Sequence, residues 1–160
     1  MCDDVFCNSL WGDLNHAFSY RPSAGASGGL LIMWDAVEVE VWSLVSHDHM
    51  LQVHGRFIQT NVEFYLFNIC APCEPRAKQE LWASLSVHLS LLRGEKVCVY
   101  GEFNSVRCPE ERRALRGGSN VLGNQHFNQF IVDNELCDLP LCGRRYTWFK
   151  GDGSSMSRID

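Results

Sequence analysis

The feature that most constrains the fold is a change of hydrophobic period close to residue 70. Before that point, apolar residues form short runs or alternate with polar ones, as in Leu30–Trp34 and Val37–Trp42. Two more runs of the same kind follow at Met50–Ile58 and Val62–Ile69, with a short connection that suits a hairpin. Runs and alternation of this length are typical of β-strands. We therefore expect the early strands to form an antiparallel meander.

After residue 70 the apolar residues follow a helical spacing instead. Pro75 suits the first turn of a helix, and Gly94 suits its end. Between them runs an apolar stripe made of Leu81, Leu85, Leu89 and Leu92. An α-helix buries residues three and four apart on one face. This segment is therefore predicted to be a helix that packs on a sheet or on another helix.

Further elements alternate along the rest of the chain. Val97–Tyr100 predicts a buried strand that includes Cys98, and a second helix is expected from about Asn124 to Asn134. This helix would bury the apolar residues Phe127, Phe130 and Ile131. Short strands are expected at Tyr146–Phe149 and Met156–Asp160. Strands mixed with helices in this way predict an α/β protein built of layers.

The length and composition place limits on the class of protein. A chain of 160 residues can form one domain with a substantial core. The longest apolar run is too short to cross a bilayer, and the N-terminus lacks the features of a secretory signal. We therefore expect a cytoplasmic or nuclear protein that is not secreted. In such a compartment the eight cysteines are expected to be free thiols.

The strand at Val97–Tyr100 is followed by polar residues whose side chains can bind a metal or a phosphate. Gly101 follows it, and then Glu102 and Asn104 stand two positions apart. On an extended segment, residues two apart project to the same side. A carboxylate and a carboxamide would then converge where the strand ends. Their oxygen atoms suit a hard cation such as Mg²⁺, and the amide can also donate to a phosphate oxygen.

These residues belong to the segment YGEFNSV (100–106), which resembles the glycine-aspartate-x-asparagine signature of the endonuclease/exonuclease/phosphatase superfamily. More closely, the chain is similar to the endonuclease domain of plant LINE-type (non-LTR) retrotransposon polyproteins, which accompanies a reverse transcriptase. The resemblance extends through SGGLLIMWD (27–35), FNICAP (67–72), FNQFI (127–131), DLPLCGRRYTWF (138–149) and SRID (157–160). It implies a DNase I-like sandwich of two sheets with outer helices.

The resemblance also implies a function, namely Mg²⁺-dependent hydrolysis of a DNA phosphodiester bond. It assigns catalytic roles to Glu102, Asn104 and Asp160, of which Glu102 and Asn104 would also bind the metal. In relatives the carboxylate at the position of Asp160 orients a catalytic histidine. Arg158 and Cys70 are weaker candidates for contacts with the substrate phosphate. The expected partner is DNA, with no membrane and no small-molecule cofactor, and the oligomeric state is left open.

Several residues depart from the family pattern. Glu102 replaces an aspartate, so its carboxylate lies one methylene further out, and a shift of about 1 Å can cost on the order of 100-fold in rate. Cys70 replaces a tyrosine that binds the phosphate, and a thiol is a poor hydrogen-bond donor. The chain is expected to be a single incomplete domain over residues 1–160, truncated at both ends and without the main metal-binding glutamate. We therefore expect a fragment that is inactive as it stands.

Two other functions stay open. Cys70 and Cys73 form a C-x-x-C motif between a strand and a helix, which resembles the active site of thioredoxin-like thiol-disulfide oxidoreductases. The third alternative is a remnant with no activity beyond weak nucleic-acid binding. The net charge of −5 gives DNA binding little support. Local basic groups are Arg107, Arg112, Arg113, Arg116, Arg144, Arg145 and Lys150.

Overall fold

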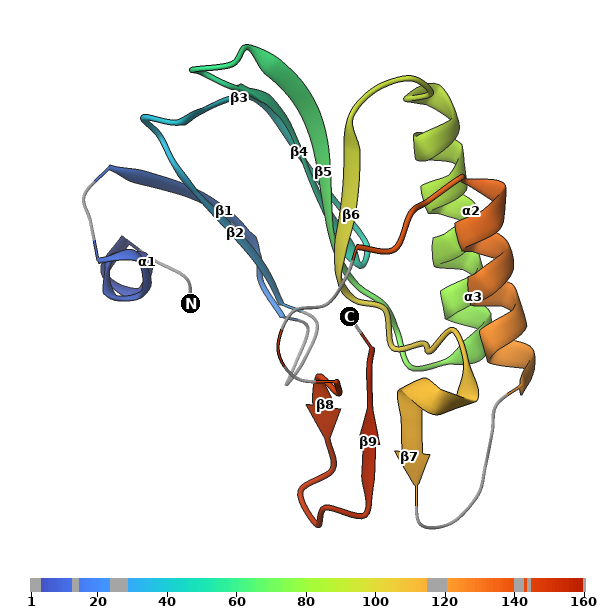
Figure 1. Ribbon diagram of the computed structural model, residues 1–160. Coiled ribbons are helices and arrows are strands. Elements are labelled where there is room, and N and C mark those ends of the chain that lie inside the picture. The colour runs from blue at the N-terminus through green and yellow to red at the C-terminus, as the bar shows by residue number, and fades with distance from the viewer. Residues whose placement is uncertain are drawn as a thin grey trace. The chain divides into compact units, whose positions relative to one another are not determined.

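A computed structural model describes residues 4–12, 15–23, 29–114, 121–139, 143 and 145–159 (Figure 1). The chain divides into two compact units by its internal contacts. The first, called here the strand unit, comprises Met1–Cys70 and Leu92–Gly101. The second, called here the helix unit, comprises Ala71–Leu91 and Glu102–Asp160. The expected catalytic residue Asp160 lies outside the described residues.

The strand unit begins with the short helix α1 (Asp4–Trp11) and contains two sheets. Strands β1 (His16–Arg21) and β2 (Leu30–Asp35) pair antiparallel to form the smaller sheet. The larger sheet has the order β3-β4-β5-β6 (Figure 1). Its strands are β3 (Val39–His47), β4 (Met50–Phe57), β5 (Val62–Cys70) and β6 (Val97–Glu102), whose last residue belongs to the helix unit.

The antiparallel meander is confirmed for β3, β4 and β5. The strand expected at residues 30–34 exists as β2, but it pairs with β1 in the other sheet and so is not part of the meander. The sequence had not predicted β1. Its residues, HAFSYR, are only partly buried and carry no run of apolar side chains, so they gave little hydrophobic signal.

The core of the strand unit lies between its two sheets. Leu30 and Ile32 of β2 are buried against Leu51 and Val53 of β4. Side chains at alternate positions of a strand share one face, so each strand contributes every second residue to this layer. Partly buried residues extend the layer, namely Trp34, Val41, Phe64, Leu66 and Cys70. Apolar burial of this kind is the main force that holds the two sheets together.

The helix unit contains α2 (Pro75–Leu91) and α3 (Val121–Asp133), which pack side by side (Figure 1). The packing is largely aromatic, because the ring of Trp82 lies 5.3 Å from that of Phe127 and 5.0 Å from that of Phe130. The predicted stripe is confirmed for Leu81, Leu85 and Leu89, which are buried together with Trp82. The burial of Phe127 and Phe130 is confirmed too, whereas Ile131 is only half-buried.

The rest of the helix unit is a 3-10 helix, η1 (Pro109–Glu111), and a small antiparallel sheet of order β7-β9-β8. Its strands are β7 (Arg112–Ala114), β8 (Trp148–Phe149) and β9 (Ser155–Ser157). The two late strands expected from the sequence correspond to β8 and β9, both shorter than predicted. Neither η1 nor β7 was predicted, because their segment is polar and lacks a periodic apolar pattern.

The fold is thus mixed α/β, with several sheets and helices. One prediction about burial was wrong, because Cys98 is exposed rather than enclosed in the core. The six described cysteines, Cys7, Cys70, Cys73, Cys98, Cys108 and Cys137, are free thiols. Within the described ranges, no helix is long and apolar enough to cross a membrane.

Candidate functional site

The end of β6 is shaped by Gly101. This residue has a φ of +120°, a conformation that side-chain-bearing residues rarely adopt. A Cβ atom at this position would lie 2.2 Å from the carbonyl oxygen of Ile69 and 2.8 Å from Oδ1 of Asn68. Both values are below any normal contact distance, so only a residue without a Cβ atom fits at this position. The backbone then continues directly into Glu102.

Glu102 is the last residue of β6 and is exposed. Its carbonyl oxygen accepts a hydrogen bond from the backbone N–H of Ala71 at 2.8 Å. The peptide of the next residue, Phe103, donates to the carbonyl oxygen of Ile159 at 2.7 Å. The segment that leads to Asp160 is therefore hydrogen-bonded to the backbone between Glu102 and Asn104.

Asn104 does not continue the extended strand. Its φ is +51°, in the left-handed region, which asparagine tolerates better than most residues. The prediction that Glu102 and Asn104 project to one side by strand alternation was therefore wrong, because the strand ends at Glu102. The Asn104 side chain instead folds back, and its Nδ2 donates to the carbonyl oxygen of Ala71 at 2.7 Å. Both residues thus hold the same neighbour, Ala71.

Lys78 of α2 is a site residue that sequence reasoning missed. Its ammonium donates to the carbonyl oxygen of Asn104, and its Nζ lies 3.4 Å from Oγ of Ser105, a buried residue. Burial lowers the pKa of Lys78, because desolvation disfavours the charged form. A sequence signal was present. Lys78 precedes Leu81 by three positions and so interrupts the apolar face of the helix with a charge.

Arg158 lies in a network of ion pairs within the helix unit. Its guanidinium contacts Glu111 at 3.2 Å and Asp138 at 2.9 Å. Asp138 also lies 3.5 Å from a guanidinium nitrogen of Arg107. Two acidic side chains therefore already neutralise Arg158, which gives it a role in the fold. The expected contact between Arg158 and a substrate phosphate stays a prediction.

Cys70 and Cys73 lie in different units. Cys70 is the last residue of β5, and its backbone N–H donates to the carbonyl oxygen of His49 at 3.0 Å. Cys73 is exposed and lies shortly before α2. The N-terminus of α2 is capped by Glu74, whose carboxylate accepts hydrogen bonds from the N–H groups of Ala77 and Arg76 at 2.6 and 3.0 Å. These bonds lower the pKa of Glu74.

The capping of α2 bears on the redox alternative. In thioredoxin-like sites, the positive end of a helix stabilises a cysteine thiolate. Here that end already binds the carboxylate of Glu74. The N-terminus of α2 therefore does not favour the redox function.

A metal bound at the end of β6 would need oxygen ligands from nearby side chains. Among the described residues, no group of three or more histidine, cysteine, aspartate or glutamate side chains is close enough to hold a metal ion. The carboxylate of Glu102 is exposed and suits Mg²⁺, which keeps several of its water molecules when bound to proteins. The end of β6 thus fits a hydrated Mg²⁺ held mainly by Glu102, because the Asn104 side chain folds back onto Ala71.

Comparisons with known proteins give no family assignment. The chain matches none of the known protein-family models, and no curated protein matches it significantly.

Proposed function

We propose that the chain derives from a Mg²⁺-dependent DNA endonuclease of the endonuclease/exonuclease/phosphatase superfamily, from a LINE-type retrotransposon, and that it is inactive as it stands. The proposal rests on the Glu102–Asn104 turn. Three independent groups fix this turn, namely the amide of Asn104 on Ala71, the ammonium of Lys78 on the Asn104 carbonyl, and the Phe103 peptide on Ile159. A turn that is held from three sides presents its side chains in a defined geometry, which is what catalysis needs.

The finer description of the fold belongs to the same proposal. The two sheets of the strand unit pack through a shared apolar layer, and this is compatible with part of a DNase I-like sandwich. Helices α2 and α3 would be the outer helices of such a sandwich.

The chemistry follows from the residues at the turn. When bound, Mg²⁺ would polarise a phosphate oxygen and stabilise the charge that develops during phosphodiester hydrolysis. Glu102 would supply the charged ligand and Asn104 a neutral oxygen. Asp160 would orient a general base, by resemblance to the family. Lys78, half-buried behind the turn, holds the Asn104 backbone and so acts on the site through another residue.

Two substitutions are the reason for proposing inactivity. At the position of Glu102 the family has aspartate, and the longer side chain moves the carboxylate by about one methylene, enough for a loss on the order of 100-fold. At the position of Cys70 the family has tyrosine, and a thiol cannot replace the phenol as a donor to phosphate. The two losses act on different contacts and should multiply.

Binding to DNA is expected to be weak. Of the basic residues in the helix unit, Arg107 pairs with Asp138 and Lys150 pairs with Asp152. Phosphate contacts from unpaired cations supply most non-specific affinity, which falls steeply with salt. Fluorescence anisotropy with a DNA duplex should therefore give weak binding that disappears when the salt concentration is raised.

The metal site can be tested without relying on activity. In an NMR titration with Mg²⁺, we expect weak, saturable shifts confined to the backbone amides around Glu102 and Asn104. Glu102→Gln should abolish them, because it removes the charged ligand. Glu110→Gln is the matched control, since Glu110 is an acidic side chain elsewhere in the same unit. Shifts that are absent, or that persist in Glu102→Gln, would contradict the proposed metal site.

Activity is tested by plasmid nicking in Mg²⁺, with EDTA as a blank. We expect the natural chain to nick no faster than Asn104→Ala. Nicking by the natural chain that is lost in Asn104→Ala would refute the inactivity.

A further inference from the structure

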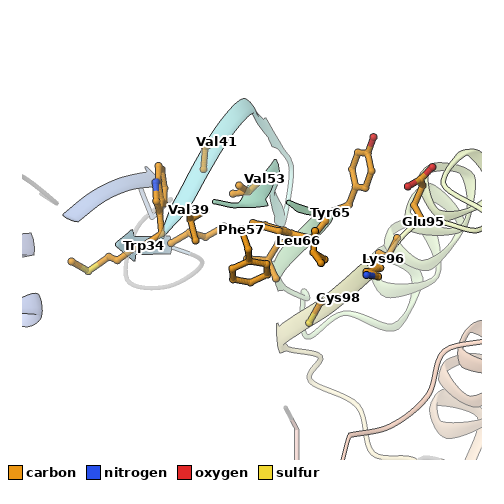
Figure 2. A pocket seen from close by; sticks show the side chains of 15 residues that line it. Trp34, Val39, Val41, Val53, Phe57, Tyr65, Leu66, Glu95, Lys96 and Cys98 are labelled. Atoms are coloured by element: carbon orange, nitrogen blue, oxygen red, sulfur yellow. The ribbon is translucent and has the colours of Figure 1, made fainter. Parts of the chain in front are cut away.

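The strand unit contains an apolar pocket of about 700 Å³ that the proposed function does not use (Figure 2). It is bounded by β2 and by the face of the larger sheet that carries the core. Its walls include Trp34, Val41, Phe57, Phe64, Leu66 and Cys98. Pockets that bind small molecules typically have volumes of about 300–1,000 Å³ and mostly apolar walls. Size and lining therefore suit a ligand with an apolar body.

Among the described residues that line the pocket, three carry a hydroxyl or a charge, namely Tyr65, Glu95 and Lys96. Figure 2 shows that they do not point the same way: the Lys96 ammonium lies on the side of Leu66 and Cys98, whereas Tyr65 and Glu95 extend to the other side. Both charged residues precede β6, which begins at Val97, and the backbone N–H of Glu95 donates to the carbonyl oxygen of Leu92 in the turn before that strand. The Tyr65 ring is already stacked on His54, with ring centroids 4.1 Å apart.

Lys96 is thus the charged group on the pocket side. Within the part of the chain that the structure describes, it forms no ion pair. Its backbone carbonyl accepts a hydrogen bond from the N–H of Tyr65 at 2.8 Å, which fixes the start of β6 beside β5. The cation therefore sits on a backbone that the sheet holds in place, at the edge of an apolar cavity.

We propose that this pocket binds an amphipathic anion, a molecule with a flexible apolar body and a single carboxylate, such as a medium-chain fatty acid. The apolar body would fill the space between β2 and the sheet, which removes apolar surface from water. The carboxylate would pair with the Lys96 ammonium at the edge. A neutral apolar molecule would gain only the burial of apolar surface, without the ion pair. A cationic amphiphile would be repelled by the Lys96 ammonium. This proposal is independent of the endonuclease origin.

The charge preference is tested by titrating the purified full chain with laurate, dodecanol and dodecyltrimethylammonium, each below its micelle concentration. Laurate should bind with one-to-one stoichiometry. Because an exposed ion pair has a modest energy, Lys96→Met should weaken laurate binding by about two- to five-fold. Lys150→Met is the matched control, since Lys150 pairs with Asp152 in the helix unit and should change nothing. Dodecanol should bind equally to all three proteins.

The place of binding is tested through Cys98, an exposed free thiol that lines the pocket. Laurate should slow the alkylation of Cys98 and leave that of Cys137, an exposed thiol of the helix unit, unchanged. Equal protection of both thiols would mean detergent-like binding and would overturn the proposal. So would laurate affinity that does not respond to Lys96→Met or Lys96→Glu. A dimer that protects Cys98 without ligand would show that a second copy of the chain occupies the pocket, which also overturns it.

Discussion

Replacing Gly101 with alanine should strongly destabilise the strand unit. Two costs can be worked out from the structure. At a φ of +120° an alanine is strained, which costs about 1–3 kcal/mol. The added Cβ would also lie 2.2 Å from the Ile69 carbonyl oxygen, and forcing such a contact costs about another 1–3 kcal/mol. The sum, roughly 2–6 kcal/mol, is a large part of the 5–15 kcal/mol that stabilises a typical domain.

Two other glycines separate these costs. Gly94 has a φ of +89° but nothing lies within 4 Å of its hypothetical Cβ, so Gly94→Ala tests conformational strain alone. At Gly55 a Cβ would lie 2.3 Å from the Glu40 carbonyl oxygen, with no positive φ, so Gly55→Ala tests the steric clash alone. The gain from a stiffer unfolded chain is about the same in all three variants and cancels.

The assay is urea denaturation followed by circular dichroism, with hydrogen exchange of the β5 amides to report on the strand unit. We expect Gly101→Ala to lose more free energy of unfolding than either Gly94→Ala or Gly55→Ala. A loss no greater than that of Gly94→Ala would refute the close approach of residue 101 to Ile69. The geometry argued for the start of the candidate site would then be wrong.

Three further predictions concern charged and titratable groups. Arg158→Ala should cost about 1–3 kcal/mol of unfolding free energy. In urea denaturation, a double-mutant cycle with Glu111→Gln should give a clear coupling energy. Additive losses in the two single variants would contradict the ion pair. Lys78→Met should lower the free energy of unfolding by about 1 kcal/mol, the value of one hydrogen bond reduced for partial exposure. It should also speed hydrogen exchange of the amides in the turn after β6. Unchanged exchange would mean that the ammonium does not hold the turn. Desolvation raises the pKa of Cys98 and of Tyr100 above their usual 9.0 and 10.0, so the folded state keeps protons that the unfolded state loses. Stability should therefore be full below about pH 9 and fall as pH rises through the folded pKa values. In thermal melting at a series of pH values, the melting temperature of the Cys98→Ser/Tyr100→Phe double variant should fall less with pH than that of the natural chain.

The elements with a strong periodic pattern could be predicted from the sequence. The strands β4 and β5 and the helix α2 were found because their apolar side chains repeat at the period of their structure. The strand β1 was missed because its residues are only partly buried and carry no run of apolar side chains. The placement of β2 in a separate sheet was missed for a related reason, since a strand's own pattern does not reveal its partner.

The position of the candidate site could be predicted from the sequence, but its geometry could not. The motif identified Glu102 and Asn104, but not the positive φ of Asn104, which ends the strand alternation. The groups that hold the turn come from Ala71, Lys78 and Ile159, and these are far from it in sequence. Long-range hydrogen bonds of this kind leave no local pattern, apart from the charge at Lys78 on an apolar helix face.

Asn104 and Glu102 differ in how strongly the fold itself requires them. An asparagine at position 104 already has a structural explanation, because it tolerates a φ of +51° and its amide satisfies the carbonyl of Ala71. Loss of function in Asn104→Ala could therefore come from a collapsed turn, and Asn104→Gly, which keeps the left-handed conformation, is needed beside it. The carboxylate of Glu102 is exposed, so changing its length should alter the chemistry more than the fold. Glu102→Asp is for this reason the more direct probe of whether an endonuclease site underlies this turn.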